Sequence, residues 1–128
     1  MIRYQLRRDV FYMDMDLRQT IAPFSWADLP SGASSVSLGV GSYLQEVFDT
    51  RAEEGFLGNG YDWESLAQVF LAEQCPQLEG EIRFDPEADT FCVYSKNKEA
   101  LRDFILRFKA ACEDRALILD LFQRAELD

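Results

Sequence analysis

Apolar and polar residues alternate along the first part of the chain, and the alternation changes parity near its middle. The apolar side chains fall first on even and then on odd positions, namely Ile2, Tyr4 and Leu6, then Phe11, Met13, Met15 and Leu17. A period of two predicts an extended chain over residues 2–17. Since one extra residue turns every later side chain to the other face, the parity change predicts a bulge or a hairpin turn near Arg8 and Asp9.

The spacing of apolar residues changes to that of helices after a predicted loop. Residues 22–35 contain prolines, a glycine and a serine cluster, which predict a loop before a short strand at residues 35–38. Residues 41–54 follow as a predicted helix with the apolar stripe Leu44, Val47, Phe48 and Ala52. Its acidic residues Glu46, Asp49 and Glu53 share another face at spacings of three and four.

A second helix, a hairpin and two further helices complete the predicted order. Residues 62–74 carry the stripe Trp63, Leu66, Ala67, Phe70 and Leu71. Residues 80–95 alternate on both sides of a Pro-containing turn, which predicts a β-hairpin. Asn97 is the expected N-cap of a helix over residues 98–112, and Asp114 is the expected N-cap of the last helix.

This order of elements predicts an α+β fold. We expect a mostly antiparallel sheet, built from N-terminal strands and the hairpin near residues 81–95, and covered by about four helices. No linker or internal repeat divides the sequence, and a chain of 128 residues has the size of one domain. We therefore expect a single domain over residues 1–128.

The segment Gly58-Asn59-Gly60-Tyr61-Asp62-Trp63 combines tight-turn residues with a carboxylate between two aromatic side chains. In a structural interpretation, Asp62 is the helix N-cap and accepts a hydrogen bond from the N–H of Ser65. Tyr61 and Leu66 then form a hydrophobic staple, both glycines take positive φ angles, and the tryptophan begins the buried stripe. In a functional interpretation, the aromatic residues anchor a protein interface and the aspartate pairs with a partner's Arg or Lys. Both interpretations stay open at this point, because a rigid junction is also a platform for contacts.

The chain carries a net charge of −10, and its acidic residues are concentrated in the middle. Residues 19–90 hold thirteen Asp and Glu against two Arg, whereas the remainder holds ten acidic and eleven basic residues. Such a field repels nucleic acid and anionic membranes and accelerates association with a cationic partner. The alternative interpretation is a solvated acidic surface that serves solubility. Because so few basic residues lie in this stretch, we expect its carboxylates to lack local ion-pair partners.

Several kinds of chemistry are excluded by the composition. The sequence contains no histidine, which rules out Ser-His-Asp and Cys-His catalysis and histidine-ligated metals. The three cysteines are widely spaced without a CxxC pair, which favours reduced, buried thiols. Residues 85–89 place carboxylates at alternate positions, but a calcium loop would need a glycine at Thr90 and a glutamate at Lys96, so we predict a polar hairpin turn. We predict no catalytic residue, no metal and no cofactor.

The apolar runs are too short to span a bilayer. The first residues also lack the apolar core of a signal peptide. We therefore expect a cytoplasmic protein without a membrane partner.

Two blocks of sequence carry a resemblance to a known family. They are the segment 58–63 described above and Phe84-Asp85-Pro86-Glu87-Ala88-Asp89-Thr90-Phe91-Cys92-Val93-Tyr94-Ser95, followed by Glu99-Ala100-Leu101. These blocks, with the helices around them over roughly residues 40–125, resemble the bacterial immunity proteins that neutralise polymorphic toxins in bacterial competition, in particular the family numbered 51. The resemblance implies a non-catalytic inhibitor that binds a cognate toxin domain and blocks its active site or its substrate surface.

Acidity and resemblance together predict a basic, cytoplasm-acting toxin, such as a nuclease, as the partner. The expected partner-binding residues are Glu46, Asp49, Glu53, Glu54, Tyr61, Asp62, Trp63 and Glu64. Two other classes of function stay open: a small metal-dependent hydrolase that uses clustered carboxylates, and a protein-interaction adaptor without a toxin. Metal titration separates the enzyme from the inhibitor, and a large secreted protein encoded directly upstream would favour immunity.

Overall fold

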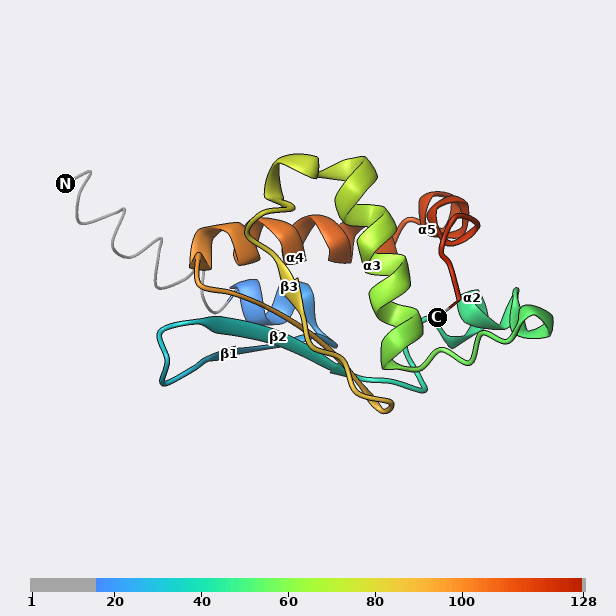
Figure 1. The fold of residues 1–128 in the computed structure, drawn as a ribbon, viewed down its shortest axis with the longest axis horizontal. Coiled ribbons are helices and arrows are strands. Elements are labelled where there is room, and N and C mark those ends of the chain that lie inside the picture. Colours follow the sequence, from blue (N-terminus) through green and yellow to red (C-terminus); the bar gives the residue numbers. More distant parts are fainter. Residues whose placement is uncertain (1–15, 128) are drawn as a thin grey trace.

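The computed structural model describes residues 16–127, in which helices pack against a four-stranded antiparallel sheet (Figure 1). After helical residues 16–21, the strands are β1 (Ser25–Asp28), β2 (Ser34–Gly39), β3 (Arg83–Phe84) and β4 (Thr90–Ser95). The helices are α2 (Gln45–Asp49), α3 (Gly60–Gln74), α4 (Lys98–Cys112) and α5 (Arg115–Phe122), and the 3₁₀ turns are η1 (Ala52–Glu54) and η2 (Pro76–Leu78). The predicted α+β class is confirmed.

One face of the sheet is buried and the other is partly open to solvent. The strand order is β1-β2-β4-β3, and β2 pairs with β4 over its whole length, with Val36 opposite Val93 and Leu38 opposite Phe91. These four side chains are buried, whereas Ser37 and its neighbours on the other parity are half-buried. Alternation in an antiparallel sheet therefore separates a core face from a wetter face.

Helices α3 and α4 cover the core face, and α5 packs beside α2 and α3 (Figure 1). The two predicted caps are confirmed, since the Asn97 side chain accepts from the N–H of Ala100 and the Asp114 side chain accepts from that of Leu117. Helix α4 spans the predicted residues 98–112. In α4 the N-cap and the apolar stripe at helical spacing both favour a helix over the same residues. Local sequence and tertiary packing therefore select the same element.

The core is organised around Trp63, which is completely buried in the first turn of α3. Its ring centroid lies between 5.1 and 6.1 Å from those of Phe24, Tyr43, Phe48, Phe91 and Phe108. These rings come from the segment before β1, the segment before α2, α2, β4 and α4. Each such aromatic pair adds about 0.5–1.5 kcal/mol beyond the area that it buries. The tryptophan therefore joins the start of α3 to the sheet and to two other helices.

The N-terminal half differs most from the sequence prediction. The predicted strands lie almost wholly outside the described residues, but the prediction of extended chain is wrong at residues 16 and 17, which are helical. Strand β1 lies within the predicted loop 22–35, so that part of the prediction is also wrong. This strand has only four residues, too few to show an alternation of apolar and polar side chains. It is defined by its antiparallel pairing with β2, in which Trp26 lies opposite Val36.

The predicted helix over residues 41–54 is also wrong in its extent, because it is broken into two short pieces. Leu44 immediately before α2 has a φ of 56°, a left-handed conformation that stops the helix from beginning earlier. After α2, the turn η1 follows and ends at Gly55, whose φ is 110°. Ala52 is exposed and does not join the buried stripe.

The position of Trp63 leads to a stability prediction. We expect Trp63→Ala to lower the free energy of unfolding by about 3–5 kcal/mol, because the cavity would remove the contacts with five surrounding rings. Denaturant unfolding followed by circular dichroism measures the change. Tyr61→Ala, two residues earlier and exposed, is the matched control and should cost less than about 1 kcal/mol. A loss below 1 kcal/mol for Trp63→Ala would contradict the central position of this ring.

Candidate partner-binding site

A buried carboxylate holds the loop that leads into α3. Oδ2 of Asp62 accepts hydrogen bonds from the backbone N–H groups of Leu57 and Gly58 at 2.7 and 2.8 Å, and a longer one from Asn59 at 3.4 Å. The Asp62 side chain is only 5% exposed. Because these bonds fix successive peptide groups, residues 57–59 have one well-defined backbone conformation.

The helix N-cap is Asn59 and not Asp62, so the predicted cap is wrong. Asn59 Oδ1 accepts from the N–H of Asp62, while the Asp62 carboxylate accepts from the N–H of Asn59, which makes a reciprocal capping box. Helix α3 accordingly begins at Gly60. The predicted staple between Tyr61 and Leu66 is absent, since Tyr61 lies inside the first turn and is 43% exposed. The N-x-x-D spacing of Asn59 and Asp62 is the sequence signal that identifies this box.

Gly60 is required by a close approach and not by its φ angle. Gly58 has the predicted positive φ of 81°, whereas Gly60 has no positive φ. A Cβ on Gly60 would lie 1.9 Å from the carbonyl oxygen of Glu87 and 2.4 Å from that of Thr90. The N–H of Gly60 donates to the carbonyl oxygen of Ala88 at 3.1 Å. The β3–β4 turn therefore rests directly on the start of α3, and the two sequence blocks identified above meet in space.

Helix α2 supports the same loop from its other side. Nε2 of Gln45 donates to the carbonyl oxygen of Leu57 at 3.0 Å and to Oδ1 of Asp49 at 3.1 Å. The N–H and the C=O of Leu57 are thus both bonded within the protein, although its side chain is 70% exposed. The arrangement fixes the backbone while it leaves the leucine side chain in solvent.

The carboxylates predicted to bind a partner fall into different environments. Asp62 is buried, as is the neighbouring Trp63, and the two side chains support the loop and the core respectively. Asp49 and Glu53 are exposed, with no ion pair among residues 16–127. Glu64 is half-buried and accepts a hydrogen bond from the Gln68 side chain.

Glu46 and Glu54 are exposed but paired. Arg115 from α5 lies 2.7 Å from Glu46, and Arg51 lies 2.8 Å from Glu54. The hydrogen bonds from these guanidinium groups lower the pKa of both carboxyl groups. The expectation that this stretch lacks local ion pairs is therefore wrong for Glu54, and Glu46 is compensated from a distant helix.

The exposed turn between β3 and β4 adds acidic groups that the prediction of the binding site left out. Asp85, Glu87 and Asp89 are exposed, and none has an ion pair within the described part of the chain. The predicted hairpin turn is confirmed by the pairing of Glu87 with Thr90. The backbone contact with Gly60 brings the turn that carries Glu87 and Asp89 to the residue before Tyr61, a proximity that spacing along the sequence does not reveal.

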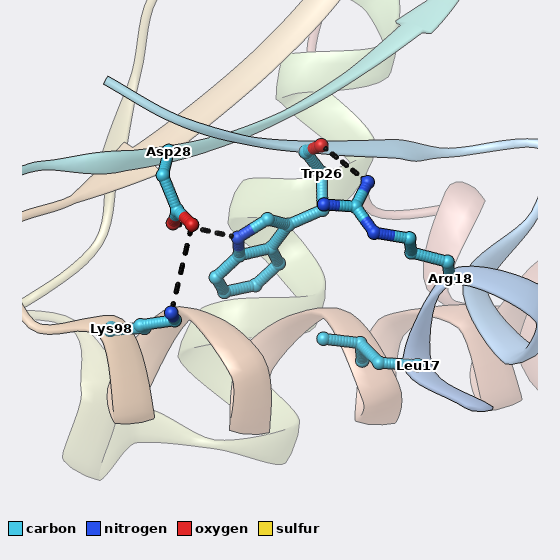
Figure 2. A pocket seen from close by; sticks show the side chains of 5 residues that line it. All are labelled: Leu17, Arg18, Trp26, Asp28 and Lys98. Carbon is cyan, nitrogen blue, oxygen red and sulfur yellow. Dashed lines mark hydrogen bonds and ion pairs between the residues drawn. The ribbon is translucent and has the colours of Figure 1, made fainter. Parts of the chain in front are cut away.

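A small pocket elsewhere is lined by Leu17, Arg18, Trp26, Asp28 and Lys98 (Figure 2). Its volume is about 50 Å³, far below the roughly 300–1,000 Å³ of small-molecule sites. Asp28 accepts hydrogen bonds from the Ser34 hydroxyl and the Trp26 indole and lies 3.7 Å from the Lys98 ammonium, and these interactions lower the pKa of its carboxyl group. These polar groups are bonded to one another, and the ion pair of Asp28 with Lys98 joins β1 to α4. The pocket is therefore a structural contact between the two elements.

The described residues bear on two other classes of function, metal-dependent enzymes and membrane proteins. Residues 16–127 contain no group of three or more Cys, Asp or Glu side chains placed to hold a metal ion. Among the same residues, none of the helices is long and apolar enough to cross a membrane. All three cysteines are free thiols, and burial raises the pKa of Cys75 to about 11.

Comparison with known proteins identifies the family. A family model described as immunity protein 51 matches residues 24–127, which include both sequence blocks and the loop between α2 and α3. The chain belongs to the immunity protein 51 family. No curated protein and no solved structure showed a match. The immunity protein 51 match begins at Phe24, before the region of resemblance found from the sequence, and so includes β1 and β2 as well.

The contact at Gly60 gives a prediction with an internal control. Gly60→Ala should lower the free energy of unfolding by about 3 kcal/mol or more, because its methyl group would overlap two carbonyl oxygens of the hairpin turn. Gly80→Ala is the control, since nothing lies within 4 Å of its added Cβ, and it should change stability by less than about 0.5 kcal/mol. Equal effects of both substitutions in chemical unfolding would rule out the contact.

Removal of the Asp62 carboxylate should loosen the loop specifically. Asp62→Ala leaves the N–H groups of Leu57 and Gly58 without their acceptor, which we expect to cost about 2–3 kcal/mol. Hydrogen exchange should become faster at these two amides, while exchange at the β4 amides changes only with global stability. Unchanged exchange at Leu57 and Gly58 would contradict this role of Asp62.

Proposed function

We propose that this chain is an immunity protein that binds and neutralises a cognate basic toxin domain acting in the cytoplasm, and that the toxin is a nuclease. Membership in the immunity protein 51 family is the observation that carries the proposal. The acidity of the chain supports the choice of a basic partner, because the net charge of −10 steers cationic proteins toward it.

The choice of a nuclease follows from what such a toxin must bind. A nuclease needs a cationic surface to hold the phosphates of its substrate. An acidic inhibitor complements that same surface and excludes nucleic acid from it. Asp49, Glu53, Glu87 and Asp89 support this mode of action, since they are exposed and have no ion pair among residues 16–127.

The inhibitor performs no reaction of its own in this proposal. The absence of histidine from the sequence and the separate environments of the acidic side chains support inhibition by binding. The hydrolase alternative needs converging carboxylates, and the described residues offer no such group.

Neutralisation and complex formation test the proposal directly. The toxin domain encoded beside this chain is expressed in bacteria with and without it. We expect growth only when both are present, a stable complex on co-purification, and loss of nuclease activity in the complex. Growth arrest that persists in the presence of the chain, without a complex, would overturn the proposal.

Charge reversal should slow encounter more than it weakens the final complex. We expect Asp49→Lys with Glu53→Lys to reduce the association rate roughly tenfold at low salt and to flatten its salt dependence. Glu79→Lys with Glu81→Lys is the control, because it makes the same charge change beyond the far end of α3, which is about 20 Å long. At 0.1 M salt, where charges are screened beyond about 10 Å, the control should reduce the association rate less than the first pair does. Stopped-flow experiments measure the association rate constants of both double variants with the toxin. Equal rate constants for the two at 0.1 M salt would show that net charge, and not the position of the carboxylates, controls association.

A further inference from the structure

We infer that the toxin contacts a surface formed by Leu57 and Tyr61 together with Asp49, Glu87 and Asp89, which we call the junction surface. The inference rests on the proposed function and specifies where the partner binds. Tyr61 and Asp49 were expected from the sequence to bind the partner, whereas the other three residues emerge from the fold. The partner that fits is a basic protein surface with an apolar pocket.

Exposed apolar side chains cluster at this junction. Four large hydrophobic residues are exposed in the described chain: Leu29, Leu57, Tyr61 and Leu127. Two of them lie on the segment from Leu57 to Tyr61, and Leu127 lies against Gly55 just before it. Single exposed leucines are ordinary on protein surfaces, but here the exposed Leu57 is followed four residues later by an exposed tyrosine, the residue type that is enriched at interface centres.

The backbone under these side chains is already ordered. The Asp62 carboxylate holds the N–H of Leu57, Gln45 holds its C=O, and the hairpin turn holds the N–H of Gly60. Ordering a loop when a partner binds costs free energy, and a loop that is fixed beforehand avoids that cost. The Asp62 carboxylate and Gln45 therefore fix the backbone of Leu57 while its side chain stays in solvent, where it contributes no burial to the stability of the free protein.

Exposed carboxylates that have no ion pair among residues 16–127 lie on the two segments that contact the loop from Leu57 to Tyr61. Gln45 connects Asp49 to the Leu57 carbonyl, and the turn that contacts Gly60 carries Glu87 and Asp89. An apolar centre with a charged rim is the usual anatomy of a protein interface. By contrast, Glu46 and Glu54 already pair with arginines of this chain, so they contribute less to a partner.

The charge of the rim selects a basic partner over a second copy of this chain. A symmetric dimer through the junction surface would place its carboxylates opposite the same carboxylates, and like charges across an interface are unfavourable. A lysine-rich or arginine-rich toxin surface supplies the complementary charge. Its apolar pocket would receive Leu57 and Tyr61, the two side chains that the rigid loop presents.

Alanine variants with a matched control test the junction surface. The binding partner in the experiment is the purified toxin domain encoded beside this chain. Its dissociation constant and its rate constants are measured by surface plasmon resonance. We expect Leu57→Ala and Tyr61→Ala each to raise the dissociation constant about tenfold or more, mainly through faster dissociation. Leu29→Ala, at the β1–β2 turn and thus at the opposite end of β2 from the hairpin tip, should stay within about twofold of the unmodified protein.

Each outcome supports or overturns a separate statement. If the unmodified chain binds and neutralises the toxin but both junction variants bind within about twofold of it, the junction surface is overturned and the proposed function stands. If the unmodified chain does not bind, the proposed function fails, and the inference fails with it. A dimer that dissociates on Leu57→Ala, without loss of toxin affinity, assigns the surface to a second copy and also overturns the inference. Thermal unfolding of each variant confirms that the fold is intact.

Discussion

The burial of Trp63 is the constraint on which the rest of the structure depends. Its ring lies among aromatic side chains from the sheet and from other helices, and this packing fixes how α3 is rotated about its axis, while the capping box of Asn59 and Asp62 fixes where the helix begins. Because Asp62 and Gly60 belong to the same turn, their positions are determined together with that of the tryptophan. Core packing therefore places the two groups, the Asp62 carboxylate and the Gly60 backbone, that hold the loop and contact the hairpin.

Successive residues of this turn have different environments for a geometric reason. Neighbouring side chains on an α-helix point about 100° apart. Tyr61 consequently faces solvent, Asp62 faces the incoming loop, and Trp63 faces the core. A single helical turn therefore joins the hydrophobic interior to an exposed aromatic side chain, with a buried carboxylate between them that satisfies the loop backbone.

The parts of the fold that could be predicted from the sequence are those in which local and tertiary preferences agree. Helix α4 has an Asn cap and a full apolar stripe, and its bounds were predicted correctly. Strand β1 was missed because its four residues are stabilised by pairing with β2 and carry no periodic signal. The break before α2 was missed because nothing local indicates that Leu44 takes a left-handed conformation. At the site, the burial of Asp62 and the pairing of Glu46 with Arg115 depend on contacts that only the folded chain creates.

The division between supporting and presented residues has a consequence for specificity. Trp63, Asp62 and Gly60 are constrained by packing, hydrogen bonds and close approach, so substitutions there disturb the frame. Leu57 and Glu87 place their side chains in solvent and use their backbones for structure, while the exposed Asp89 side chain accepts one hydrogen bond, from the Thr90 hydroxyl. Substitution of exposed side chains usually changes the free energy of unfolding by less than about 0.5 kcal/mol, whereas it alters the shape and charge offered to a partner. The frame thus separates the residues that hold the fold from the exposed side chains that a partner can contact.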